Sequence, residues 1–401
     1  MASSMASKAL DNTNPLKVIG VVGGGQLAQM LVLAGKEKEV DVIVQTGSVS
    51  DPAAKKSTNH IIREPTDFEG TKELASKCNS ITFENEWINV REFIDLENNG
   101  IKFIPSLSSL EPLVDKLLQR NLLKKLNIAG PDFIALNSNR FSYTKLPEDW
   151  QFPIMAKASR GGYDGKGTRV IHSFSELEKL FNQVNKDIWF IEKWIKYEKE
   201  LAIVASRDFE GQVRVFPLVE TFQSNQVCEW VLVPSNVSHQ VEAMARNIAT
   251  SLLTNIDYVG VIAIEFFFGS NGLMVNEIAP RTHNSAHYSI EACNTSQFDQ
   301  QLCIASHLPL SDPKLLSPGA IMINLLGLPE SSNLSLEKRI SDINNIEGAS
   351  LHWYEKELES PGRKVGHVTF LLKEQKNEDR LVEAKSILKK IRSIWPLYSA
   401  N

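Results

Sequence analysis

The stretch YVGVIAIEFFFGSNGLMVNEIAP (residues 258–280) has apolar runs on both sides of a Gly-Ser-Asn-Gly turn and predicts an antiparallel β-hairpin. In a hairpin centred on residues 269–272, paired positions have numbers that sum to about 541 or 542, and 265 and 277 sum to 542. We therefore expect Glu265 and Glu277 to be cross-strand neighbours on one face of the sheet. Like charges at that spacing, with Cβ atoms about 5 Å apart, destabilise a sheet. A divalent cation such as magnesium, shared with nucleotide phosphates, would neutralise them; the alternative is that both carboxylates are solvated.

Four polar side chains follow the hairpin within five positions: Arg281, His283, Asn284 and Ser285. Arginine binds anions with paired donors, and histidine transfers protons near neutral pH. A lone histidine here would mean little. As a block beside two glutamates, these residues predict an anion-binding and proton-handling segment.

The stretch SRGGYDGKGT (residues 159–168) has four glycines within seven residues and lies between strand-like segments. It does not match the phosphate loop G-x-x-x-x-G-K-[ST], which leads into a helix. We expect a strand-loop-strand flap whose backbone N–H groups, with Lys157 at the end of the entering strand, cover a polyphosphate. The alternative is an ordinary glycine-rich hairpin, although a plain turn needs only one or two glycines.

Nearer the N-terminus, KVIGVVGGGQLAQMLVLAGKEKEVDVIVQTG (residues 17–47) predicts a βαβ unit with a glycine turn at the start of its helix. The turn fits the loose dinucleotide pattern G-x-G-x-x-A, and the helix N-terminus could receive a phosphate. A nicotinamide site also needs an acidic residue after the second strand, where this chain has Gln45. A mononucleotide phosphate, or tight packing of strand against helix, therefore fits the turn better than NAD.

The remaining pattern divides the chain into three regions. ITFENEW (81–87) and IKFIP (101–105) are predicted strands that complete a small doubly wound α/β domain over about residues 17–105. A helical pattern over 113–127 follows, and from residue 151 short strands alternate with glycine turns around one helical segment at 238–255. A third region begins near Leu310 and ends in a predicted helix over 378–392.

Composition excludes several classes of protein. With 42% hydrophobic and 23% charged residues, the 401-residue chain can fill the cores of two or three domains. Its net charge of −5 argues against nucleic acid and membrane surfaces as partners, and no apolar run reaches the roughly 18–20 residues of a membrane span. The four cysteines are far apart, so we expect no disulfide framework or structural zinc and a reducing, intracellular setting. Residues 1–15 are small and polar and are predicted to be a disordered tail.

Six motifs occur in the chain in order: GGGQLAQM, SRGGYDGKGT, GVIAIEFF, NEIAPRTHNSAH, HWYEKE and PGRKVGH. With them the chain resembles the ATP-grasp superfamily, and within it the 5-(carboxyamino)imidazole ribonucleotide synthases of de novo purine biosynthesis. The resemblance implies a mixed α/β and α+β fold. Its parts would be a doubly wound parallel sheet of the pre-ATP-grasp type over residues 16–110, an ATP-grasp domain over 111–310 and a small C-terminal domain over 311–401.

The activity that the resemblance implies is ATP-dependent carboxylation of aminoimidazole ribonucleotide with bicarbonate. ATP would phosphorylate bicarbonate to carboxyphosphate, which delivers its carboxyl group to the exocyclic amine, and ADP and phosphate would leave. The cofactors implied are ATP and Mg²⁺. A cytoplasmic homodimer that passes its product to a mutase of the same pathway is also implied, with no nucleic acid and no membrane as partners.

The resemblance also implies roles for individual residues. Magnesium would be held by Glu265 and Glu277. Asp164 would orient the amine and accept its proton, Arg281 would steady the carboxyphosphate charge, and His283 is a second candidate for proton transfer. The residues implied to contact ATP are Lys116, Lys157, Gly162, Tyr163, Asp164, Gly165, Lys166, Gly167, Thr168, Glu192, Lys193, Trp194, Ile195, Glu200, Asn276 and Glu277. Those implied to contact the imidazole ribonucleotide and bicarbonate are Gln26, Leu27, Glu84, Tyr163, Asp164, Arg281, His283, Asn284, Ser285, Lys356 and Arg363, with Glu86 as a further candidate.

This sequence departs from the family pattern at four places. Ala28, Lys166 and Gln223 are found where a glycine, an arginine and a histidine are expected, and the acidic strand FENEW has its residues in another order. None of these changes removes a metal or phosphate group. Three alternative functions are weighed against the main hypothesis: another ATP-grasp carboxylase or ligase with a different acceptor, an oxidoreductase built on GGGQLA, and a non-catalytic ATP-binding regulator. The HNS and PGRK blocks argue against a different acceptor, and Gln45 argues against an oxidoreductase. The intact set of Glu265, Glu277 and Lys157 argues against a non-catalytic regulator.

Overall fold

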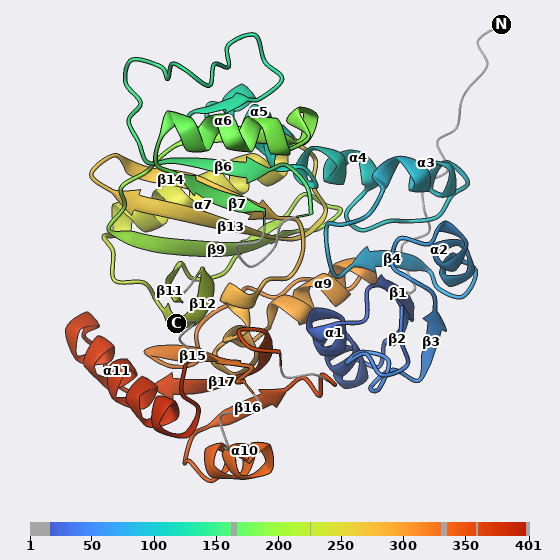
Figure 1. Cartoon of the computed structure of the whole chain (residues 1–401). Coiled ribbons are helices and arrows are strands. Elements are labelled where there is room, and N and C mark those ends of the chain that lie inside the picture. The colour runs from blue at the N-terminus through green and yellow to red at the C-terminus, as the bar shows by residue number, and fades with distance from the viewer. Residues whose placement is uncertain (1–16, 162–166, 225, 330–334, 358–359, 398–401) are drawn as a thin grey trace, which may run out of the picture.

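The computed structural model describes residues 17–161, 167–224, 226–329, 335–357 and 360–397. The predicted tail, residues 1–15, lies outside these ranges. Three sheets organise the described chain, and Figure 1 shows the N-terminal sheet (blue) to one side of the other two.

The N-terminal sheet confirms the predicted doubly wound α/β arrangement. Four parallel strands lie in the order β3-β2-β1-β4, formed by β1 (Val18–Val22), β2 (Asp41–Thr46), β3 (Asn59–Ile62) and β4 (Ser80–Phe83). Helices α1 (Gln26–Glu37), α2 (Phe68–Ala75) and α3 (Val90–Asn98) connect or follow them. The predicted strand at 101–105 is reduced to one parallel bridge between Ile81 and Phe103. Pro105, which has no N–H group to donate, ends that predicted segment.

The second sheet is small and antiparallel, with the order β5-β8-β6-β7. Its strands are β5 (Phe133–Ala135), β6 (Ile154–Ala158), β7 (Thr168–Ile171) and β8 (Trp189–Lys193). Helix α6 (Phe174–Gln183) covers it by burying Leu177 and Leu180, and the short helix η2 (Lys186–Ile188) leads into β8. Strands β6 and β7 pair with Lys157 opposite Thr168, so the glycine run joins two antiparallel neighbours as predicted.

The third sheet has nine strands and extends from the predicted hairpin into the C-terminal region. Its order is β14-β13-β9-β11-β12-β15-β17-β16, with β10 on β9. The strands are β9 (Lys199–Arg207), β10 (Val213–Val215), β11 (Val219–Ser224), β12 (Val227–Val233), β13 (Gly260–Gly269), β14 (Gly272–Ala279), β15 (Gly319–Leu326), β16 (Ser350–Trp353) and β17 (Lys364–Leu372). Because β15 pairs with β12 through Trp230 and Ile323, the C-terminal strands continue the central sheet.

Helices cover the large sheet and fill the junctions. They are α4 (Leu107–Leu110), η1 (Glu111–Leu113), α5 (Lys116–Lys125), α7 (His239–Asn255), η3 (Asn284–Ala286), α8 (Ser289–Ala292), α9 (Gln297–Ala305), α10 (Leu336–Asn344) and α11 (Asn377–Ile394). Helix α7 packs Ala249 and Leu252 onto the β9–β13–β14 face, and α11 packs Ala384 and Ile391 onto β15 and β17. None of the helices in the described ranges is long and apolar enough to cross a membrane.

Helix α9 lies between the N-terminal sheet and the large sheet (Figure 1). It is built to be buried on several sides, since Phe298 and Leu302 pack in the core around α1 while Gln297, Gln300 and Gln301 are also buried. Gln301 accepts from Val261 N (2.7 Å) on β13 and donates to Thr82 Oγ1 (2.9 Å) on β4. A buried carboxamide satisfied on both sides ties the two sheets together.

Candidate functional site

Two carboxylates face each other on the β13–β14 hairpin. Glu265 and Glu277 are direct cross-strand partners, which confirms the predicted register, and a β-bulge follows Glu265. Burial, reinforced by the charges of Glu277 and Glu200, raises the pKa of Glu265 to about 7. Burial also acts to raise the pKa of Glu277, but the nearby Lys116, Lys157 and Arg120 charges outweigh it and lower that pKa to about 2. The repulsion expected from the sequence is thus relieved in part by unequal ionisation.

A cationic group lies beside Glu277. Lys116, the first residue of α5, places Nζ 2.8 Å from Glu277 Oε1. Burial acts to lower the pKa of Lys116, but the Glu277 carboxylate outweighs burial and raises it. The Lys116 ammonium is therefore held in its charged form at one end of the carboxylate pair.

Lys157 belongs to a second, more buried network. Its Nζ lies 2.8 Å from Glu192 Oε2, and Arg120 Nε pairs with the other oxygen of Glu192. Arg120 Nη2 also donates to Asn276 O (2.6 Å), and Lys157 Nζ lies 3.4 Å from Asn276 Oδ1. Burial acts to raise the pKa of Glu192, but the two cations outweigh it and lower that pKa, so Glu192 holds both of them in place. This network joins the small sheet to β14 directly beside Glu277.

The base of the predicted flap is anchored on Asp115. This carboxylate caps α5 by accepting from Leu117 N (2.9 Å) and Leu118 N (3.0 Å). Its other oxygen accepts from Ser159 Oγ (3.0 Å) and Arg160 Nε (2.9 Å), at the end of β6. Gly167 and Thr168 lie where β7 begins, and the other predicted flap residues, Gly162, Tyr163, Asp164, Gly165 and Lys166, lie outside the described residues.

The other residues implied to contact ATP lie on β8, directly after it and on β9. The Glu192 side chain is buried in the network described above, Lys193 pairs with Asp149, and Trp194 is exposed. Ile195 is half-buried. Glu200, on β9, accepts from Tyr197 Oη (2.5 Å), and the structure places it across from Phe267 of β13.

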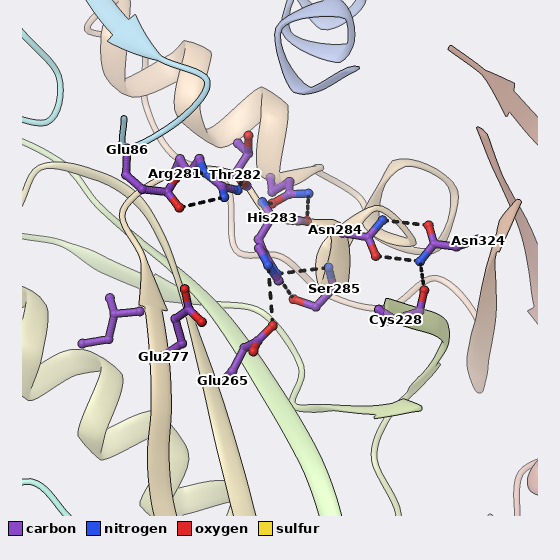
Figure 2. A network of polar contacts seen from close by, with 12 residues as sticks. Glu86, Cys228, Glu265, Glu277, Arg281, Thr282, His283, Asn284, Ser285 and Asn324 are labelled. Carbon is purple, nitrogen blue, oxygen red and sulfur yellow. Dashed lines mark hydrogen bonds and ion pairs between the residues drawn. The ribbon is translucent and has the colours of Figure 1, made fainter. Parts of the chain in front are cut away.

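The segment after β14 brings Arg281 and His283 to the same edge as the carboxylates (Figure 2). Arg281 pairs with both oxygens of Glu86, at 2.6 and 3.3 Å, in a partly buried bidentate contact. His283 points toward Glu265, with Nε2 3.6 Å from Oε1. His283 Nδ1 accepts from Ser285 N (3.3 Å) and lies 2.9 Å from Ser285 Oγ, so the neutral ring carries its proton on Nε2, facing Glu265.

Asn284 points away from these groups and pairs with Asn324 of β15. Their carboxamides exchange two hydrogen bonds, of 2.8 and 2.7 Å, and Asn324 also donates to Cys228 O (2.9 Å; Figure 2). Both asparagines are buried. Asn284 therefore anchors the segment to the C-terminal strands, and Ser285 orients the His283 ring.

The N-terminal glycine turn is occupied by Glu84. Its carboxylate accepts from Gly25 N (2.6 Å) and Leu27 N (3.0 Å) at the start of α1. This carboxylate takes the place that a phosphate would have at a helix N-terminus. Burial raises the pKa of Glu84. A cavity of about 390 Å³ opens beside the turn and is lined also by Asp51 and Glu64.

The neighbouring residue Gln26 contacts the C-terminal region. Lys356 Nζ donates to Gln26 Oε1 (2.7 Å) and to Lys364 O (2.6 Å). Arg363, the residue before Lys364, is exposed, and Leu27, the residue after Gln26, is buried. The structure thus brings the first glycine turn and the HWYEKE motif together, although 330 positions separate Gln26 from Lys356.

The sequence did not predict the supporting roles of Arg120, Asn324, Asp115 and Gln297, the last of which bonds to the main chain of His283. Arg120 carried a usable signal, because a charged residue lies on the buried face of the amphipathic helix α5. Gln297 carried none that we recognise, since it differs in no visible way from the glutamines at 300 and 301.

The donor set can be tested for a metal. Within the described ranges, no group of three or more His, Cys, Asp or Glu side chains is arranged to hold a metal by itself. Glu265 and Glu277 supply oxygen donors only, and their side chains remain 30% and 35% exposed. Hard oxygen donors with open positions fit magnesium, whose other ligands would come from phosphate and water.

Three family models match consecutive parts of the chain. They are the ribonucleotide synthetase preATP-grasp domain over residues 16–112, the ATP-grasp domain over 121–298, and the phosphoribosylaminoimidazole carboxylase C-terminal domain over 320–380.

Known proteins of similar sequence and structure agree with these matches. The N5-carboxyaminoimidazole ribonucleotide synthase of Synechococcus elongatus is 39% identical, and the match covers 96% of both chains. The Staphylococcus aureus N5-carboxyaminoimidazole synthetase in complex with ADP is 31% identical, with a TM-score of 0.82 over 93% of this chain and 99% of that one. The Aspergillus clavatus synthase in complex with ADP and 5-aminoimidazole ribonucleotide is 27% identical, with a TM-score of 0.83 over 96% and 99%.

Proposed function

This chain belongs to the N5-carboxyaminoimidazole ribonucleotide synthase family of ATP-grasp enzymes, and on that premise we propose that it carboxylates 5-aminoimidazole ribonucleotide with ATP and bicarbonate. The observation that carries the proposal is the meeting of two sets of residues at one edge of the large sheet. The Glu265–Glu277 pair with its lysines lies there, and so does the segment with Arg281 and His283.

The phosphate side of the reaction needs positioning and charge neutralisation more than covalent help. In the proposed first step, a bicarbonate oxygen attacks the γ-phosphorus of ATP, the bond to the β,γ-bridging oxygen breaks, and ADP leaves with carboxyphosphate formed. Lys116 and Lys157 supply fixed positive charge to the phosphates, and Asn276, on β14 of the hairpin, contacts Lys157. Arg120 and Glu192 keep Lys157 in place without reaching the phosphates themselves.

Magnesium is the metal that we propose for Glu265 and Glu277. When bound, it would neutralise the carboxylate pair and the developing charge on the transferred phosphoryl group. Its oxygen donors are the two glutamates, one of which, Glu265, must lose its proton to act as a ligand.

The acceptor side lies toward Arg281 and the N-terminal domain. In the second step the exocyclic amine of the ribonucleotide bonds to the carboxyl carbon, the carbon–oxygen bond to phosphate breaks, and the amine loses a proton. We propose that the positive charge of Arg281 steadies carboxyphosphate, since Glu86 and Thr282 O fix the position of its guanidinium group. Asp164 is the first proposed acceptor of that proton and His283 the second, and we propose that Glu84, Gln26 and Lys356 line the ribonucleotide pocket.

Further parts of the proposal concern partners. We propose that the enzyme works as a homodimer and that its product, an unstable N-carboxylated amine, passes to a mutase of the same pathway.

The experiment that tests the function is ADP release by the purified protein with Mg-ATP and bicarbonate. We expect strong stimulation by 5-aminoimidazole ribonucleotide and none by other small amines, such as glycinamide ribonucleotide. Stimulation by a different acceptor would keep the ATP-grasp chemistry and reject the proposed substrate. Absence of stimulation by either ribonucleotide would reject the proposal.

A further inference from the structure

The main chain of His283 is held by a single side chain. His283 N donates to Gln297 Oε1 (2.7 Å), and Gln297 Nε2 donates to His283 O (2.7 Å). A carboxamide that bonds to both the N–H and the C=O group of one residue fixes the main chain of that residue much as a neighbouring strand would. Gln297 is completely buried and is the first residue of α9, a helix capped by Ser296 and Asp299.

The same carboxamide also reaches the end of the segment. Gln297 Nε2 lies 3.1 Å from His287 Nδ1, and because Gln297 Oε1 already accepts from His283 N, its nitrogen must be the donor. Burial lowers the pKa of His287 well below its usual value, so the His287 ring is neutral and can accept at Nδ1. One side chain therefore spans residues 283 to 287.

The same arrangement occurs three residues before Arg281, at Ile278. Gln119 of α5 accepts from Ile278 N (3.1 Å) and donates to Ile278 O (2.8 Å), next to Glu277. Strand β14, which carries Glu277, and the histidine segment, residues 283–287, are thus each held by a buried glutamine from a different helix. Helix α9 is itself fixed, since Gln301 bonds to both β13 and β4.

We propose that Gln297 is a positioning residue, which holds the His283 main chain so that His283 Nε2 faces Glu265 in the geometry needed for turnover. Gln297 does not act on the substrate itself. Its effect passes through His283, and the proposal rests on the proposed role of His283 in the carboxylation.

The variant that tests this is Gln297→Met, which keeps the length of the side chain and removes all three of its hydrogen bonds. The matched control is Gln300→Met on the same helix. Gln300 is also buried, and its side chain makes two hydrogen bonds, from Ser206 Oγ (2.8 Å) and to Ser311 O (2.6 Å), away from the histidine segment. Gln297→Glu, which keeps the acceptor for His283 N and loses the donor to His283 O, serves if the methionine variant does not fold.

We expect Gln297→Met to lower kcat at least tenfold with less than a threefold change in the KM for ATP, whereas Gln300→Met changes both less than threefold. In a His283→Ala background, Gln297→Met should lower kcat by less than twofold, because its effect has already been lost. Amide hydrogen exchange of residues 281–289 should quicken in Gln297→Met and not in Gln300→Met.

Three results would overturn the inference: a kcat within twofold of the unchanged protein, an equal loss in the His283→Ala background, or exchange of residues 281–289 that does not change. If the unchanged protein shows no ribonucleotide-stimulated ADP release, the proposed function fails instead, and the exchange measurement still decides whether Gln297 holds the segment.

Discussion

Glu265 and Glu277 are chemically identical and are paired across one ladder on the same face of the sheet, yet their surroundings differ. Lys116 lies 2.8 Å from Glu277, whereas Glu265 has His283 at 3.6 Å. The pKa of Glu277 is lowered to about 2, and that of Glu265 is raised to about 7. At neutral pH, Glu265 is therefore the carboxylate whose proton must leave before a cation binds.

Glu265→Gln tests this difference through stability. The unfolded chain loses the Glu265 proton near pH 4.5, whereas the folded protein keeps it to about pH 7. The unfolding free energy contributed by Glu265 therefore falls as pH rises through this window, by an amount of order ~1 kcal/mol after solvent screening. Denaturant titrations in EDTA should show that Glu265→Gln gains stability relative to the unchanged protein between pH 5 and pH 8. A constant difference would contradict the assignment.

Lys116→Met tests the charge beside Glu277. Without the ammonium, the pKa of Glu277 rises and the phosphates lose one fixed positive charge, so we expect kcat/KM for Mg-ATP to fall about 100-fold. The acid limb of the pH–rate profile should also move to higher pH. Lys116→Arg, which keeps the charge, serves as the control. An acid limb that stays in place in Lys116→Met would show that Lys116 does not set the ionisation of the Glu265–Glu277 pair.

At the scale of the element, the start of helix α5 connects Lys116, which we propose to bind the phosphates, to the base of the predicted flap. Asp115 caps this helix and at the same time binds Ser159 and Arg160 at the end of β6. One carboxylate therefore fixes the start of α5, where Lys116 lies, and the base of the glycine run.

Asp115→Ala should lower the unfolding free energy by about 1–3 kcal/mol, because it removes a cap and leaves buried donors unpaired. It should also raise the KM for ATP about tenfold, because the base of the glycine run loses its anchor on Asp115. A tenfold change corresponds to about 1.4 kcal/mol of binding free energy. The matched control is Asp67→Ala, which removes the cap of α2 at Gly70 N (2.9 Å) far along the chain. A KM for ATP that changes equally in both variants would contradict the link to the flap.

Elements also show what sequence can and cannot predict. The register of Glu265 and Glu277 was predictable because a short turn between two apolar strands leaves few ways to pair them. The pairing of Asn284 with Asn324 and of Arg120 with Asn276 was not predictable, since neither pair shares a strand ladder or a helix face. Such contacts depend on how distant elements pack, and a residue pattern carries no information about that.

The same limit applied to the sheet as a whole. A separate C-terminal region from about Leu310 was expected, but the pairing of its strand β15 with β12 was not, because a sequence pattern does not identify the neighbours of a strand. Glu84 was predicted to line the substrate side. Its place at the N-terminus of α1 follows from the parallel β1–β4 pairing, which brings both strand ends to one edge.

At the scale of the molecule, the C-terminal region contacts the N-terminal domain through the loop after β16. Lys356 reaches Gln26, and Lys55 Nζ donates to Glu355 O (2.7 Å). The N-terminal domain and the C-terminal region thereby meet beside the glycine turn, where the ribonucleotide is proposed to bind.

Lys356→Met should raise the KM for 5-aminoimidazole ribonucleotide about tenfold or more, with a smaller change in kcat, since it removes a binding charge rather than a reacting group. Lys55→Met is the control, because it removes a contact between the same two regions at an exposed position. Equal effects of the two variants on this KM would indicate that Lys356 acts only by joining the domains.

The central claim is that this chain transfers the carbon of bicarbonate to the exocyclic amine of 5-aminoimidazole ribonucleotide with one ATP consumed. The most direct measurement follows ¹³C-bicarbonate by NMR in the presence of Mg-ATP and the ribonucleotide, with ADP measured in the same sample. The account predicts one labelled carboxyl group on the amine for each ADP formed. ADP formation with no labelled carboxylated product, under conditions where an added standard of that product survives, would contradict it.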